Sequence, residues 1–151
     1  RTDFNTFADF HLAKFSNPKK EVASVGKAEL IEAMTEVIYD KVYVEGMSPE
    51  LFNQANVCMK HAVDCIAESK KALMLLSKYK EQSESLSRHS IAVAVYSVML
   101  AKELGHEEES SLRDLAIAGI FHDIGRFKQL MEYNTFNDAE SFDHADLPLK
   151  L

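Results

Sequence analysis

The chain has 151 residues, of which 46% are hydrophobic and 27% are charged, a composition that indicates a folded globular protein and argues against disorder or a disulfide scaffold. Its formal net charge of -7 disfavours a nucleic-acid polymer as partner, because such binding depends largely on neutralising phosphates. The apolar runs are shorter than the roughly 18 residues that span a bilayer, and the first residues show no secretory signal. We therefore expect a cytoplasmic protein without a membrane span.

The first half of the chain predicts two helices. Residues 27–44 carry apolar side chains on a 3.6-residue period, and Gly46 ends this helix. Ser48 and Pro49 then form an N-cap followed by a proline at the first helical position, which predicts the start of the next helix. The helical spacing continues from there to about residue 79.

A polar stretch at residues 80–85 interrupts the apolar periodicity. Such a stretch has no apolar anchors and is typical of a linker. We therefore divide the chain into an N-terminal helical region, residues 1–80, and a second region, residues 81–151.

Two further helices are predicted in the second region, at residues 86–104 and 108–123. Gly105 ends the first of them and Gly125 ends the second, whose acidic start favours a helix N-terminus. Because the connecting turn is short, the two helices should pack antiparallel. The expected inner faces are Leu86, His89, Val93, Tyr96, Met99, Leu100 and Leu104 on the first helix, and Leu112, Leu115, Ala116, Ala118 and Gly119 on the second.

The remaining residues, 126–151, predict a loop at 133–138 and a short helix that starts within 143–147. No alternation of apolar and polar residues typical of a strand is present in the sequence. The predicted fold class is therefore all-α.

The strongest chemical signal is the adjacent pair His122 and Asp123 at the end of an apolar helix. Neighbouring side chains on a helix point about 100° apart, so at a helix end both can reach one ion placed beyond the terminus. Imidazole and carboxylate together suit divalent transition metals. We therefore predict that this pair binds a metal ion.

His89 is predicted to join the pair. It lies 16 residues before Gly105, and His122 lies 17 residues after it. Arms of nearly equal length on a helical hairpin bring both imidazoles to the same end. The alternative interpretation is that His89 is a hydrogen-bonded core residue.

Residues 86–127 resemble the HD superfamily of metal-dependent phosphohydrolases, in which a histidine on one helix is followed by an adjacent His-Asp pair on the next. The stretches 88–90, 96–105 and 118–125 look most like the HD-GYP branch, whose members hydrolyse cyclic di-GMP. Residues 27–79 are similar to the helical extension that precedes the HD core in some members. The resemblance thus implies an HD-domain-like helical bundle preceded by a helical extension.

The resemblance also implies further site residues. His144 corresponds to a later histidine of the HD-GYP branch, and Asp123 would bridge two ions. Arg126 stands where a lysine is usual in the HD-GYP branch. Its planar guanidinium group suits contact with a phosphate. The alternative interpretation is that its charge compensates the dipole at a helix C-terminus. The predicted metal ligands are His89, His122, Asp123 and His144, the predicted catalytic residues are Asp123 and Arg126, and the predicted substrate-binding residues are Arg126, Arg88 and Lys128.

The resulting hypothesis is a metal-dependent phosphohydrolase that uses one or two divalent ions, Fe or Mn, and a small phosphorylated nucleotide as substrate. The resemblance favours cyclic di-GMP phosphodiesterase activity. Residues 126–144 look more like stand-alone HD hydrolases, so an HD nucleotide phosphohydrolase is the first alternative. The second alternative is a non-enzymatic HD-related signalling module.

Two expectations concern the rest of the protein. The N-terminal helices are a candidate surface for a homo-oligomer. In the HD-GYP branch the Gly-Tyr-Pro motif, and across the superfamily a late aspartate that closes the metal site, would lie beyond Leu151. A third alternative is therefore that this chain is a fragment with an incomplete metal site, which is inactive as it stands.

Overall fold

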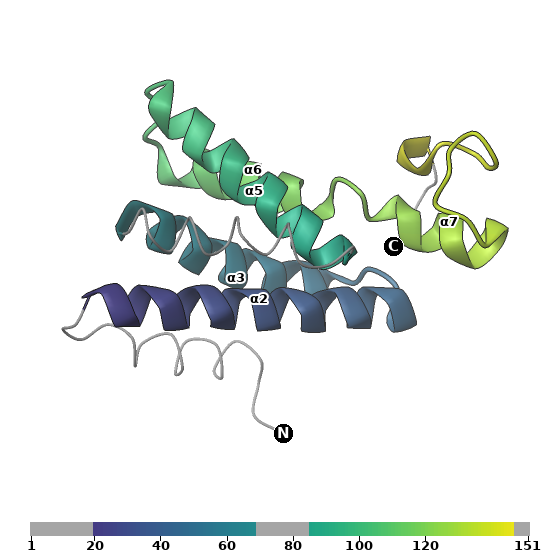
Figure 1. Cartoon of the computed structure of the whole chain (residues 1–151), viewed down its shortest axis with the longest axis horizontal. Helices are drawn as coiled ribbons and strands as arrows, with labels where there is room; N and C mark the ends of the chain where they lie inside the picture. Colours follow the sequence, from purple (N-terminus) through teal and green to yellow (C-terminus); the bar gives the residue numbers. More distant parts are fainter. Residues whose placement is uncertain (1–19, 69–84, 147–151) are drawn as a thin grey trace.

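The computed structural model describes residues 20–68 and 85–146, and these residues form helices without any strand (Figure 1). In chain order, the elements are α2 (Lys20–Glu45), α3 (Pro49–Glu68), α5 (Leu86–Glu103), α6 (Glu109–Phe121), α7 (Gly125–Tyr133) and the short 3-10 helix η2 (His144–Asp146). The predicted all-α fold class is confirmed. None of the helices in these two ranges combines the length and the apolar character that a membrane span requires.

The turn between α2 and α3 forms where the sequence predicts it. Gly46 has a φ of +81°, in the left-handed region that glycine adopts without steric cost. The hydroxyl of Ser48 accepts a backbone N–H of the first turn of α3 at 3.2 Å, and Pro49 takes the first helical position. The N-cap prediction is confirmed, whereas α2 begins at Lys20, earlier than the predicted start at residue 27.

One cluster of buried apolar side chains joins α2, α3, α5 and α6. Ile31, Ile38, Met59 and Ile120 are each at most 2% exposed within it, and burying a side chain of this size stabilises a fold by about 1.5–3 kcal/mol. The cluster draws on residues from both sides of the predicted domain boundary. That boundary falls within residues 69–84, outside the described residues, so the division of the chain stays a prediction.

The hairpin of α5 and α6 is antiparallel, as predicted (Figure 1). Gly105 in its turn has a φ of +86°, and no atom would contact a Cβ there, so the backbone conformation is what requires glycine. The carboxylate of Glu108 caps α6 by accepting the backbone N–H of Ser111 at 3.2 Å. The start of α5 and the end of α6 therefore lie at the same end of the hairpin.

The buried faces of this hairpin differ from the predicted ones. On α5, Tyr96, Leu100 and Leu104 were expected inside but are 48%, 62% and 70% exposed. The reason is the close approach of the two helices, since a Cβ on Gly119 would lie 2.6 Å from Cα of Ala94. Such an approach requires a small residue, Ala94, at the contact and so turns the side of α5 that carries it inward. The buried residues are Ser87, Ser90, Ile91, Ala92, Ala94, Val95 and Val98 on α5, and Leu112, Ala116, Ile117, Gly119 and Ile120 on α6.

The predicted end of the fourth helix is also wrong. α6 ends at Phe121, and Gly125 begins α7 instead of ending α6. Residues 122–124 form a tight turn between the two helices, in which the N–H of Ile124 donates to the Phe121 carbonyl at 3.1 Å. The pair that the sequence placed in the last turn of a helix therefore lies in the turn that follows it.

The sequence analysis interpreted Gly125 as a residue that ends a helix, but the structure requires glycine at this position for packing. A Cβ at this position would overlap with the carbonyl oxygen of His144 in η2. Arg126 consequently lies in the first turn of α7. The interpretation that it compensates the dipole at a helix C-terminus is therefore wrong, because the positive charge stands at an N-terminus.

Tyr39 connects α2 to the last turn of α6. Its hydroxyl donates a hydrogen bond to the backbone oxygen of Ile120, and its ring packs edge-on against Phe127 with centroids 5.4 Å apart. The carbonyls of a last helical turn lack partners within the helix, so this bond satisfies one of them. Burial raises the pKa of the Tyr39 hydroxyl above its ordinary value, which keeps the donor protonated.

Tyr39→Phe should lower the free energy of unfolding by about 1–3 kcal/mol, because the Ile120 carbonyl loses its donor while the ring packing stays. Urea unfolding followed by circular dichroism measures this change. Tyr43→Phe is the matched control, since Tyr43 also packs on Phe127, at 5.6 Å, but is 46% exposed. The control should change stability by less than about 0.5 kcal/mol, and equal effects of the two variants would contradict the assignment.

Candidate metal centre

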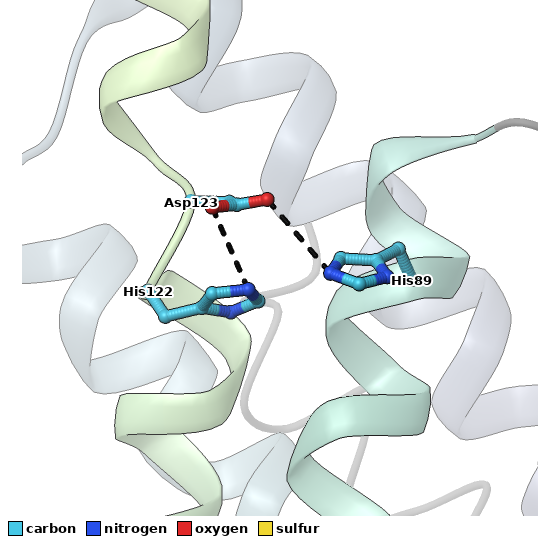
Figure 2. A group of neighbouring side chains, drawn as sticks. All are labelled: His89, His122 and Asp123. Carbon is cyan, nitrogen blue, oxygen red and sulfur yellow. Dashed lines mark ion pairs between the residues drawn. The ribbon is translucent and has the colours of Figure 1, made fainter. Parts of the chain in front are cut away.

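The end of the hairpin brings His89 and His122 together, with ring centroids 5.3 Å apart. Figure 2 shows both imidazoles turned toward the carboxylate of Asp123, which follows α6 in the turn. One potential ligand atom of each of these three residues lies within 4.8 Å of the others. The hairpin spacing thus leads to the proximity that the sequence predicted.

The carboxylate of Asp123 is the centre of this group. Its side chain is 9% exposed. Atom Oδ1 lies 3.0 Å from Nε2 of His144 and 3.5 Å from Nε2 of His122. Atom Oδ2 lies 3.0 Å from Nε of Arg126 and 3.8 Å from Nε2 of His89. Each of the three predicted histidine ligands therefore lies beside Asp123, but only His89 and His122 also lie close to one another, and His144 joins the group through Asp123 alone.

Asp123 is held in its ionised form. Burial on its own would raise the pKa of this carboxyl, but the hydrogen bond from Arg126 lowers it, and the charges of His122, Arg126 and His144 lower it further. The net result is a pKa below the ordinary value. The side chain is thus in the state that a metal ligand requires.

A hydrogen bond to the backbone sets the proton position on His122. Its Nδ1 lies 2.8 Å from the carbonyl oxygen of Gly119, and a carbonyl can only accept, so Nδ1 carries the hydrogen. In the neutral ring, Nε2 then has the lone pair. It is Nε2 that faces Asp123, and histidines that bind metals are commonly oriented by such a bond from the other nitrogen.

His144 shows the same arrangement with a carboxylate in place of a carbonyl. Its Nδ1 lies 2.9 Å and 3.1 Å from the two oxygens of Asp138, and its Nε2 faces Asp123. Hydrogen bonds from the His144 side chain and from its backbone N–H lower the pKa of Asp138 to about 2. An ionised carboxylate can only accept, so Nδ1 of His144 carries the hydrogen as well.

These residues fit a divalent transition metal. One ligand atom each of His89, His122 and Asp123 lies within 4.8 Å of the others, and His144 approaches this group through Asp123. Imidazole nitrogens combined with a carboxylate oxygen are a donor set for ions such as Fe and Mn. The fit thus follows from the proximity of these three ligand atoms as well as from the residue types.

The predicted substrate-binding cations lie in different surroundings. Arg126 is at the centre, where its Nε donates to Asp123 and its Nη1 donates to the Phe136 carbonyl at 2.9 Å. The Nε atom of Arg88 donates to Glu32 of α2 at 2.8 Å. Lys128 pairs with Glu132 one turn later on α7, at 3.7 Å. A contact of these three side chains with a substrate stays a prediction.

The sequence did not single out Asp138 and Gln129. Gln129 is fully buried, and its Nε2 donates to Asp138 at 2.8 Å and to the hydroxyl of Ser141 at 2.7 Å. A polar loop that precedes His144 was visible in the sequence. The spacing of its residues along the sequence does not indicate that the loop folds back onto α7. No sequence pattern could therefore link Asp138 and Gln129 to the candidate metal centre.

Comparison with known proteins identifies the family. The model of the HDOD domain matches residues 59–139, more than half of the chain, and this range includes His89, His122 and Asp123. Neither the curated proteins nor the solved structures yielded a match. The HDOD domain is all-helical and HD-like, which supports the predicted superfamily and fold but does not single out the HD-GYP branch. The chain therefore belongs to the HDOD domain family of HD-related helical domains.

Proposed function

We propose that this chain is a metal-dependent phosphohydrolase domain of HD type. The observation that supports it most is the convergence of three imidazoles, from three separate segments, on the nearly buried carboxylate of Asp123. A domain that acts only by binding partners does not need three imidazoles gathered around one carboxylate. Such clusters of interacting titratable groups are typical of functional sites.

The proposed roles follow from the contacts. His89, His122, Asp123 and His144 would hold one or two ions, Fe or Mn. When bound, a divalent ion stabilises phosphoryl oxygens as a Lewis acid and lowers the pKa of water. Arg126 keeps Asp123 ionised and oriented through its Nε and donates to the Phe136 carbonyl through its Nη1. Its Nη2 would be the donor to a phosphate oxygen.

Two further cations are proposed to bind the substrate. Arg88 directly precedes His89, and Lys128 lies in the same first half of α7 as Arg126. Each would exchange a carboxylate partner, Glu32 or Glu132, for a phosphate. The substrate would be a small phosphorylated nucleotide. Cyclic di-GMP is favoured by the likeness of residues 86–127 to the HD-GYP branch, and a nucleoside phosphate by the likeness of residues 126–144 to stand-alone HD hydrolases.

A second candidate function is a non-enzymatic signalling module. The match to the HDOD domain favours it, because this match indicates an HD-related signalling domain and does not itself indicate catalysis. In that case the cluster around Asp123 would be an ion-pair network, in which protonated imidazoles take the place of a metal ion. The two candidates differ in whether the purified protein binds a transition metal.

The test combines metal content with hydrolysis. The purified chain is incubated with Mn²⁺ or Fe²⁺, freed of excess metal, and analysed for bound metal; hydrolysis of cyclic di-GMP, nucleoside monophosphates and nucleoside triphosphates is then followed. We expect bound metal and hydrolysis of one of these substrate classes. His122→Ala should lower metal affinity by at least about 100-fold, more than is typical of losing an outer partner of a ligand.

His106→Ala is the matched control, because His106 is exposed in the turn between α5 and α6, at the opposite end of the hairpin. It should bind metal like the unmodified chain. Bound metal without hydrolysis of any substrate would contradict the enzymatic proposal. If the unmodified chain binds no transition metal, the signalling module becomes the better explanation.

A further inference from the structure

The segment that follows α7 folds back on this helix and returns with η2 beside it (Figure 1). Two side chains of α7 hold this segment. Arg126 donates to the carbonyl of Phe136 at 2.9 Å, and the fully buried Gln129 donates to Asp138 at 2.8 Å and to Ser141 at 2.7 Å. The loop is therefore attached to the same helix whose first turn follows Asp123.

Asp138 is the point where the attached loop meets η2. One of its oxygens, Oδ1, accepts the backbone N–H of His144 at 3.1 Å and lies 2.9 Å from Nδ1 of the same residue. Gly125 leaves room for this arrangement, since a Cβ there would overlap with the carbonyl oxygen of His144. Backbone and imidazole of His144 are thus both held, which leaves Nε2 as the nitrogen that faces Asp123 at 3.0 Å.

We infer that Asp138 is a positioning residue of the proposed metal centre, which keeps the hydrogen of His144 on Nδ1 and so directs the Nε2 lone pair at the ion. A carboxylate that accepts from one nitrogen of a metal-binding histidine fixes its proton position and makes the other nitrogen a stronger donor. The inference rests on the proposed function for the presence of the ion. The position of the hydrogen on His144 does not depend on it.

The same residues do not form a second metal site. Ligand atoms of Asp138, Asp143 and His144 lie within 4.8 Å of one another. However, Oδ1 of Asp138 already faces N–H donors of His144 and Gln129, and Oδ1 of Asp143 accepts the backbone N–H of Ala145 at 2.9 Å. Donor hydrogens that point into a cluster repel a cation, so this group is arranged to hold His144.

The test compares Asp138→Ala with Glu140→Ala in the full chain. Glu140 lies in the same loop and accepts from Thr135 and Asn137, so its removal is a matched control for the loss of a loop carboxylate. Long-range ¹H–¹⁵N spectra of the metal-free protein report which imidazole nitrogen carries the hydrogen, and His144→Ala assigns the signal. Calorimetry measures the affinity for Mn²⁺.

We expect the unmodified chain and Glu140→Ala to show the hydrogen of His144 on Nδ1. Asp138→Ala should lose this preference and bind Mn²⁺ about 10–100-fold more weakly, as is typical when an outer partner of a ligand is removed. Asp138→Asn keeps an acceptor oxygen and the loop contacts but no charge. It should retain the Nδ1 form and recover only part of the affinity, and it provides the same comparison if Asp138→Ala does not fold.

Two results would overturn the inference. One is an unchanged hydrogen position on His144 in Asp138→Ala, and the other is a loss of Mn²⁺ affinity in Glu140→Ala as large as that in Asp138→Ala. If the unmodified chain binds no Mn²⁺, the proposed function fails. The hydrogen position measured in the same metal-free samples then decides alone whether Asp138 positions His144.

Discussion

Asp123→Asn should lower the affinity for Mn²⁺ at least about 100-fold, more than the loss of an outer partner typically costs, although the side chain keeps its shape. The amide has no negative charge, and its NH₂ group replaces one of the two carboxylate oxygens, so only one oxygen remains as a ligand atom. Arg126, whose Nε lies 3.0 Å from the carboxylate, loses its charge partner at the same time. Calorimetric titration of the metal-free protein with Mn²⁺ measures the affinity, and the hydrolysis assay measures the consequence.

The control for this variant is Asp114→Asn, which removes one charge from an exposed position of α6. It should bind Mn²⁺ like the unmodified chain, because a surface charge at a distance from the site contributes little. Circular dichroism of both variants shows whether the helices are intact. Metal affinity and hydrolysis in a folded Asp123→Asn that equal those of Asp114→Asn would exclude Asp123 as a ligand and with it the proposed centre.

Gly119→Val should lower the free energy of unfolding by about 3 kcal/mol, the upper part of the range for overpacking a core. A Cβ at this position would lie 2.6 Å from Cα and 2.8 Å from the backbone nitrogen of Ala94. Backbone atoms cannot rotate away as a flexible side chain can, so the two helices of the hairpin must separate. Urea unfolding followed by circular dichroism measures the loss of stability.

Ala118→Val is the matched control for Gly119→Val. Ala118 is the preceding residue on α6 and is exposed, so the variant adds the same β-branched side chain without a packing conflict. Its cost should stay within the difference in helix propensity, less than about 0.7 kcal/mol. A stability of Gly119→Val equal to that of Ala118→Val would show that the hairpin accepts a side chain at its closest contact.

The separation of the helices also has a consequence for the site. His122 is held by its bond to the carbonyl of Gly119, and His89 stands on the facing helix. A hairpin that opens at Gly119 therefore moves one imidazole away from the other. We expect Gly119→Val, where it still folds, to bind Mn²⁺ more weakly than Ala118→Val.

The features that the sequence predicted correctly are local or depend on counting along regular helices. Ser48 and Pro49 start a helix, and Gly46 and Gly105 adopt positive φ values in turns, because each acts through its own backbone. The proximity of His89 and His122 follows from two helical arms of similar length on one turn. Such patterns do not depend on the rest of the molecule.

The buried face of α5 could not be predicted in this way. Large apolar residues lie on both sides of this helix, Tyr96 and Leu100 on the exposed one and Ile91, Val95 and Val98 on the buried one, so periodicity alone does not choose between them. The structure buries the side with Ala94 because the facing helix carries Gly119, and the two backbones approach more closely than large side chains would permit. This choice depends on a pair of residues on different helices.

By itself, the sequence determined the all-helical fold, the hairpin and the adjacent His122 and Asp123 at its end, because helix period and turn residues act over a few positions. The tertiary structure alone decided that Gly125 opens a helix, and that Asp138 holds the imidazole of His144 against Asp123. The contact of Gly125 with the His144 carbonyl and the position of Asp138 both involve a loop that folds back on α7 through bonds between residues six to twelve positions apart, for which no periodic pattern exists.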